Sequence, residues 1–224
     1  MTRRWAIGLL TGAAMAATAV LAGCGLVGGS PSYRFRMTVE VQTPQGLQTG
    51  SSVMEVVAAK GIAIGDSSGV TSAIVGEAVV IDLPDGPIFV LLSLPDAKGS
   101  LQGYVRTALL DDPSETPDGV IADVARLGRG GEREYKGDLP PDVWPMMVRF
   151  GDIADPRTIQ RVDPVAVGVR RIALETTREP VTTGIEKRLG WLPTVYETLR
   201  GSKFKPKGIP VGDFKRLFST ELGE

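Results

Sequence analysis

The segment Tyr33–Gln42 (YRFRMTVEVQ) alternates without a break between large apolar and polar side chains. Successive side chains of a β-strand point to opposite faces of a sheet, so residues two apart share a face. The apolar face consists of Tyr33, Phe35, Met37, Val39 and Val41. Alternation of this kind is typical of a strand that buries one face and exposes the other to water. We therefore expect a half-buried strand over residues 33–42.

A second strand is expected directly after the first. The sequence TPQGLQTG at residues 43–50 is rich in turn-forming residues, and we expect it to form a loop. Residues 52–59 then have strand character. The two segments together predict a long hairpin.

Two similar segments follow, VVIDLPDG at residues 79–86 and VLLSLPDA at residues 90–97. In each, an apolar run ends in Leu-Pro-Asp. Proline cannot donate to a β-ladder and aspartate favours turns, so each segment should end a strand. Two copies indicate a meander with similar turns, because a repeat protein needs at least about three units.

Two helices are indicated at about 100–110 and 117–127. Ser100 is a suitable N-cap for the first, and the apolar residues that follow it have helical spacing. Thr116 is a suitable N-cap for the second, Pro117 fits the first turn, and Gly128 fits the end. Both apolar faces should pack against the core.

The C-terminal half gives mixed signals. Residues 128–142 are rich in glycine and charge and predict a long loop or a boundary between two layers, whereas residues 144–150 and 167–176 predict strands. Thr183 and Glu186 have the spacing of a capping box, which predicts a short helix that reaches Leu189. We expect an α+β fold, with one or two antiparallel sheets and two or three short helices, in a single domain over residues 33–224.

Composition excludes several classes of function. The chain has 25 basic and 26 acidic residues, which argues against a nucleic-acid partner. It has no histidine and one cysteine, which excludes Ser-His-Asp and Cys-His catalysis and the usual zinc, iron and copper sites. Hydrolysis by a carboxylate pair, a Ser-Lys nucleophile and a calcium-type site remain open. We expect no cofactor, and a non-catalytic protein rather than an enzyme.

The N-terminus has the parts of a secretory signal. Arg3 and Arg4 precede an apolar run over residues 6–20, and small residues precede Cys24, the only cysteine of the chain. Glycine and threonine dilute the run, which is weak for a membrane-spanning helix of roughly 20 apolar residues. The alternatives are an ordinary secretory signal and a short anchor helix that contains a cysteine by chance.

The tetrapeptide Leu21-Ala22-Gly23-Cys24 resembles the lipobox of bacterial lipoproteins. The resemblance implies removal of residues 1–23 by a signal peptidase that recognises Leu21, Ala22 and Gly23. It also implies attachment of lipid to Cys24 and anchoring in a membrane. Gly25 follows the cysteine, where aspartate would resemble an inner-membrane retention signal, so outer-membrane sorting is favoured. Residues 24–32 are then expected to be a flexible tether, since glycine and serine leave the backbone free.

Two acidic clusters are candidate sites. Asp111–Asp118 is dense in oxygen ligands, but it lacks EF-hand spacing and lies between two predicted helices, so we favour a solvated linker over a calcium site. Asp152, Asp155 and Asp163 lie near Arg157 and Arg161. We favour turns and ion pairs there over the carboxylate pair of a glycoside hydrolase.

Residues 200–216 form a basic segment with interleaved phenylalanines. Its charges could contact anionic lipid headgroups, each contributing about 1 kcal/mol near such a surface. The alternative is a solvated face on the body, with Phe214 and Phe218 packing inward. The candidate contacts are Lys203, Lys205, Lys207, Lys215 and Arg216.

A weaker resemblance concerns the body. Residues 150–164 (FGDIADPRTIQRVDP) and 179–192 (EPVTTGIEKRLGWL) are similar to segments of uncharacterised proteobacterial envelope proteins. This resemblance supports a bacterial envelope protein and implies no activity. We therefore expect a lipid-anchored, non-catalytic protein that binds a protein, glycan or lipid partner or belongs to an assembly. The alternative is a hydrolase with an Asp/Glu pair.

Overall fold

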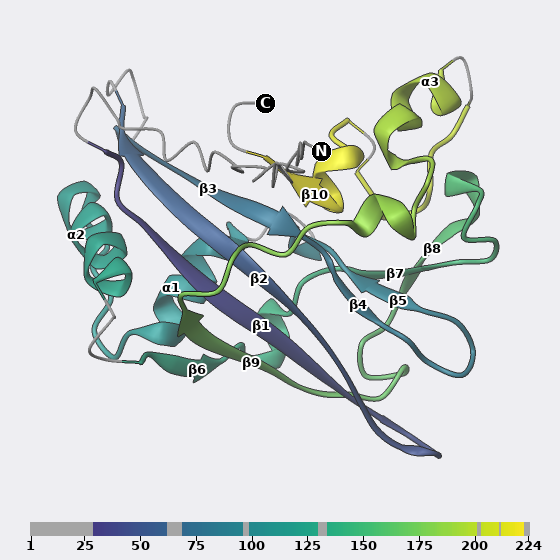
Figure 1. The fold of residues 1–224 in the computed structure, drawn as a ribbon, viewed down its shortest axis with the longest axis horizontal. Helices are drawn as coiled ribbons and strands as arrows, with labels where there is room; N and C mark the ends of the chain where they lie inside the picture. The colour runs from purple at the N-terminus through teal and green to yellow at the C-terminus, as the bar shows by residue number, and fades with distance from the viewer. Residues whose placement is uncertain are drawn as a thin grey trace, which may run out of the picture.

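Two antiparallel β-sheets and short helices make up the structure, a computed structural model that describes residues 29–61, 69–95, 99–129, 134–200, 203–210 and 212–221 (Figure 1). The predicted α+β class is confirmed. In spatial order, the first sheet contains β10 (Ser219–Thr220), β3 (Val70–Glu77), β2 (Gly46–Lys60), β1 (Ser32–Thr43), β9 (Val169–Thr177) and β6 (Lys136–Asp138). The second contains β4 (Val79–Ile81), β5 (Ile88–Val90), β7 (Met147–Phe150) and β8 (Ile159–Val162).

The helices are short, and several have 3-10 geometry. The α-helices are α1 (Leu101–Leu109), α2 (Pro117–Gly128) and α3 (Val195–Leu199). The 3-10 helices are η2 (Pro141–Val143), η3 (Pro156–Thr158), η4 (Ile185–Lys187), η5 (Leu192–Thr194) and η6 (Lys215–Leu217). In Figure 1, α1 and α2 lie towards one end of the β1–β2 hairpin, and the second sheet lies towards the other.

The β1–β2 hairpin is confirmed, and its five predicted core residues in β1 are all buried. The loop predicted for residues 43–50 is wrong, because Thr43 already pairs with Gly46. Gly46 has a φ of 118°, which only glycine adopts at low cost and which permits the tight turn. Leu47–Gly50 therefore belong to β2.

The polar face of the first sheet carries ion pairs between neighbouring strands. Arg34 of β1 pairs with Glu55 of β2, and Arg36 pairs with Glu175 of β9. Arg171 of β9 pairs with Asp138 of β6 at 2.8 Å. Alternation in β1 thus separates a charged outer face from a fully apolar inner face.

The inner face of the first sheet packs against α1, α2 and the second sheet, and this contact forms the first core. The two helices begin at their predicted N-caps: the Ser100 hydroxyl accepts from the Gly103 amide at 3.3 Å, and the Thr116 hydroxyl accepts from the Gly119 amide at 3.2 Å. At Gly50 an added Cβ would lie 2.2 Å from the Val80 carbonyl oxygen. Glycine therefore lets β2 and β4 approach closely.

The opposite face of the second sheet carries a second core, which the C-terminal segment covers. Phe214 and Phe218 are both fully buried there, as predicted for a segment that packs inward. The Phe218 ring lies 6.0 Å from Phe89 and 5.8 Å from Trp191, in edge-to-face geometry. The described residues between 185 and 218 thus form a third layer beyond the second sheet.

Residues 128–142 do not form one long loop. Their described part contains β6, which pairs with β9, and η2. β9 in turn pairs with β1, and β7 pairs with β5. Each sheet therefore contains strands from before and from after this segment. The strand predicted for residues 144–150 begins at Met147.

Candidate functional site

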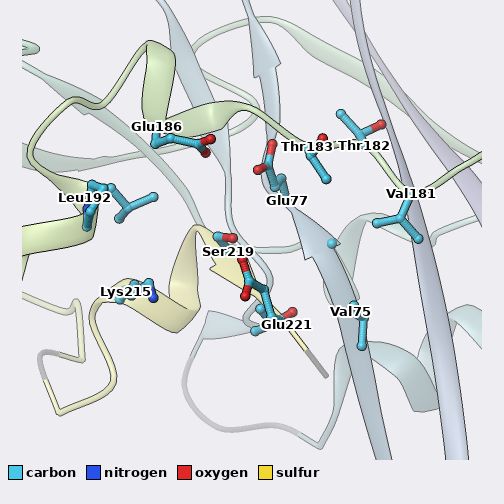
Figure 2. Close-up of a pocket in the computed structure, with 13 residues that line it drawn as sticks. Val75, Glu77, Val181, Thr182, Thr183, Glu186, Leu192, Lys215, Ser219 and Glu221 are labelled. Atoms are coloured by element: carbon cyan, nitrogen blue, oxygen red, sulfur yellow. The ribbon is translucent and has the colours of Figure 1, made fainter. Parts of the chain in front are cut away.

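A pocket of about 550 Å³ lies where β3 ends, between β10, the segment 181–186 and the 3-10 helices η5 and η6 (Figure 2). Its walls contain the apolar side chains of Val75, Val181, Leu192 and Pro193. Three glutamates from separate segments line it as well: Glu77, Glu186 and Glu221. We call it the glutamate pocket.

The segment after β9 forms one wall of the pocket because hydrogen bonds hold it against Val53 of β2. The Thr182 amide donates to the Val53 carbonyl, and the Val53 amide donates to the Thr182 hydroxyl, both at 2.9 Å. These bonds hold residues 181–183 beside the end of β3.

Glu77 is the most firmly held of the three glutamates. It is 6% exposed, and its two carboxylate oxygens accept from the amides of Gly184 at 2.8 Å and Ile185 at 2.9 Å. The carboxylate therefore satisfies the first amides of η4, as a side-chain cap would. Figure 2 shows the carboxylates of Glu77 and Glu186 facing one another across the pocket.

The predicted capping box at Thr183 is wrong. Gly184 precedes η4 with a φ of 109°, and no side-chain cap from Thr183 forms. A carboxylate 107 residues earlier in the chain takes that place. The helix predicted up to Leu189 is only the short 3-10 helix η4, and the third α-helix lies at Val195–Leu199 instead.

The electrostatics of the pocket favour a proton or another positive charge. Burial raises the pKa of the Glu77 carboxyl above its usual 4.5, the two amide bonds lower it, and the charges of Glu186 and Glu221 raise it. The net direction is upward. Lys215 also lines the pocket and supplies one positive charge against three carboxylates.

The predicted lipid site lies outside the described residues, as Cys24, Leu21, Ala22 and Gly23 all precede residue 29. The basic residues of the predicted anionic-surface contact differ in exposure and do not all line the same pocket. Lys203, Lys205, Lys207 and Arg216 are exposed, whereas Lys215 is half-buried at the glutamate pocket and Lys207 lines a separate pocket beside β8. Phe204 packs on Phe214 with ring centroids 5.6 Å apart.

The aspartates of residues 152–163 form turns and an ion pair, as predicted. Asp152 accepts from the Ala154 amide and Asp163 from the Val165 amide, each at 2.9 Å. Asp155 accepts from the Arg157 side chain at 2.8 Å, and this bond lowers the pKa of Asp155.

The acidic cluster Asp111–Asp118 extends from just after α1 into the first turn of α2. Asp111 and Asp112 are exposed, and Asp118 pairs with Lys60 at 2.7 Å. Within the described ranges, no group of three or more Asp, Glu, His or Cys side chains gathers to hold a metal ion.

The glutamate pocket was not predicted, because its three acids are far apart in the sequence. One signal was present: Glu77 interrupts the apolar run AIVGEAVVI at residues 73–81. A charged residue within such a run is rarely buried without partners, so it marks a position with a special role.

None of the helices in the described part of the chain is long and apolar enough to cross a membrane. No protein-family model matches the chain, and neither the curated proteins nor the solved structures contain a significant match. The resemblance of residues 150–164 and 179–192 to envelope proteins therefore stays a prediction.

Proposed function

We propose that this protein is a lipid-anchored protein of the bacterial cell envelope whose folded domain binds, without catalysis, a ligand in the glutamate pocket. The ligand class that fits is a positively charged group on an apolar body. The observation that carries this proposal is that three glutamates from separate segments line one apolar-walled pocket.

The anchoring part of the proposal rests on the sequence. The lipobox-like Leu21-Ala22-Gly23-Cys24 follows a basic and then an apolar segment. Acyl chains on Cys24 would hold the domain at the outer membrane, facing the periplasm, since two or more chains give stable attachment. Cys24→Ala should abolish labelling of the protein by a palmitate analogue in bacterial cells, and undiminished labelling would contradict the anchor.

The binding part rests on how the pocket is built. Val75, Val181 and Leu192 offer apolar surface, while Glu77 is held in place by backbone amides and cannot turn away. Fixed polar groups at an apolar cavity are the usual form of a small-molecule site. An ammonium group that enters here meets negative charge without having to reorganise it.

A matched pair of probes tests this directly. Hexylammonium and hexanol have the same apolar body and differ in the charged head. A ligand that binds only the folded state raises the unfolding temperature, so hexylammonium should raise it clearly more than hexanol does. Equal shifts with the two probes would contradict a site selective for positive charge.

Hydrolysis by a carboxylate pair is the second candidate, because the raised pKa of Glu77 beside Glu186 is a feature shared with general acids. Both oxygens of Glu77 already accept backbone amides, which favours a structural role. Turnover of chromogenic glycosides that is lost in Glu186→Gln would replace the binding proposal with this one.

A further inference from the structure

Arg149 occupies a position between the two sheets where an apolar residue is expected. Met147, two residues earlier in β7, lies in the first core, whereas Val148 lies in the second core. Residues two apart in a strand share a face, so Arg149 points to the same side as Met147, towards the first sheet. A charged side chain thus stands at an inward-facing position.

Arg149 lines a cleft of about 730 Å³ between the sheets. The β1–β2 turn, from Gln42 to Gln45, forms one wall, and Arg149 with its cross-strand partner Gln160 forms the other. Leu83 and Val162 line it from the edge of the first core. We call it the inter-sheet cleft.

The Arg149 guanidinium has no partner in the described part of the chain. Its Nε is buried without a hydrogen bond, and no ion pair forms with the described residues around it. Asp85 and Asp163 line the same cleft, yet neither pairs with Arg149. By contrast, the Arg106 side chain of α1 is paired and lies 2.5 Å from Asp123.

An unpaired guanidinium that lines a cleft is a recognition group for an anion. A partly buried guanidinium without a partner is costly, and an anion bound to it offsets this cost. The planar guanidinium donates two parallel hydrogen bonds to a carboxylate. The two aspartates in the lining repel a dianion, but they tolerate or attract a ligand whose remaining part is neutral or positive.

We propose that the inter-sheet cleft is a second binding site, in which Arg149 holds the carboxylate of a small ligand. The rest of that ligand, neutral or positively charged, passes Asp85 and Asp163. This site is separate from the glutamate pocket. It would bind a negatively charged group, whereas the glutamate pocket would bind a positively charged one.

Calorimetric titration of the full chain in a nonionic detergent tests the site, with titrations into detergent alone subtracted. The probes are hexanoate, ε-aminocaproate, hexylammonium and inorganic phosphate. Hexanoate and ε-aminocaproate should bind, and phosphate should bind more weakly than hexanoate. Arg149→Met should weaken hexanoate by about tenfold or more, because it removes a charge-assisted pair, and should leave hexylammonium unchanged.

A stability measurement separates binding from a structural role. Methionine keeps apolar contacts and removes an unpaired buried nitrogen, so Arg149→Met should be as stable as the natural chain or more so. If that variant fails to fold, Arg149→Lys can replace it. Lysine keeps the positive charge but lacks the planar guanidinium, so this variant should bind hexanoate more weakly than the natural chain does.

Three results would overturn the proposal. The first is no hexanoate binding to the natural chain, and the second is unchanged binding in Arg149→Met, or in Arg149→Lys if the methionine variant fails to fold. The third is tighter binding of phosphate than of hexanoate, which would make the cleft a site for a different anion.

Discussion

Glu77 and Gly184 are joined by a 2.8 Å hydrogen bond across 107 residues of sequence, with the amide of Gly184 donating to the carboxylate. The neighbouring amide of Ile185 donates to the other oxygen at 2.9 Å. The end of β3 is thereby fixed to the start of the C-terminal layer. The same two hydrogen bonds orient the Glu77 carboxylate, which lines the proposed binding site.

Glu77→Gln should lower the free energy of unfolding by about 1–3 kcal/mol, because the amide –NH₂ of glutamine would face one of the two backbone N–H groups and leave a buried donor unpaired. Urea unfolding at neutral pH measures this. Glu186→Gln is the matched control, since Glu186 is exposed and the same substitution should change stability by no more than about 0.5 kcal/mol. Equal losses in the two variants would contradict the capping role.

The pH dependence of stability should report the raised pKa of Glu77. A carboxyl whose pKa is raised by folding contributes stability that is fully present below its usual 4.5 and is lost as pH rises through the folded value. The natural chain should therefore gain stability relative to Glu77→Gln as the pH falls from neutral towards 4.5. Both proteins share all other carboxyl groups, so the comparison isolates the contribution of Glu77. A loss of stability of the natural chain relative to Glu77→Gln in acid would show that folding lowers the pKa of Glu77.

Tyr33→Phe should leave stability unchanged or raise it by up to about 1 kcal/mol. Tyr33 is 3% exposed, and its hydroxyl has no hydrogen-bond partner among the described residues. Removing a buried, unpaired hydroxyl while keeping the ring removes the cost of desolvating that hydroxyl. Chemical denaturation measures the effect, and a clear loss of stability would mean that the hydroxyl has a partner in solution.

Asp123→Ala should be among the most destabilising single changes, at about 3–5 kcal/mol, because it leaves Arg106 partly buried without its carboxylate. Asp123 is 6% exposed, lies 2.5 Å from the Arg106 Nη1 and also accepts from the Ser114 amide at 2.8 Å. The bond network joins α1 to α2.

Asp118→Ala serves as the control for this network. Asp118 forms an ion pair with Lys60 on the exposed start of α2, where water screens the pair. Its removal should change stability little in the same unfolding experiment. Losses of similar size at Asp118 and Asp123 would contradict the distinction between the two ion pairs.

Local sequence patterns predicted the elements that are determined by neighbouring residues. Period-two alternation placed β1 with its correct buried face, and the caps at Ser100 and Thr116 placed α1 and α2. These features depend on side chains within a few positions of one another. The same patterns predicted the α+β class.

Features that depend on distant residues were missed. The cap of η4 comes from Glu77, far outside the window of a capping box. β6 is three residues long and is a strand only because β9 lies beside it. The glutamate pocket has the same origin, since its three acids line one pocket only after the C-terminal layer has folded back onto β3.

The most direct test of the binding role is calorimetric titration of hexylammonium into the full chain and into Glu186→Gln, with Glu197→Gln on α3 as the control that makes the same charge change away from the pocket. We expect saturable binding to the natural chain, weakened about tenfold in Glu186→Gln, weakened by added salt and unchanged in Glu197→Gln. Equal affinity in all three proteins, or no saturable binding to the natural chain, would contradict a glutamate pocket that binds a cationic ligand.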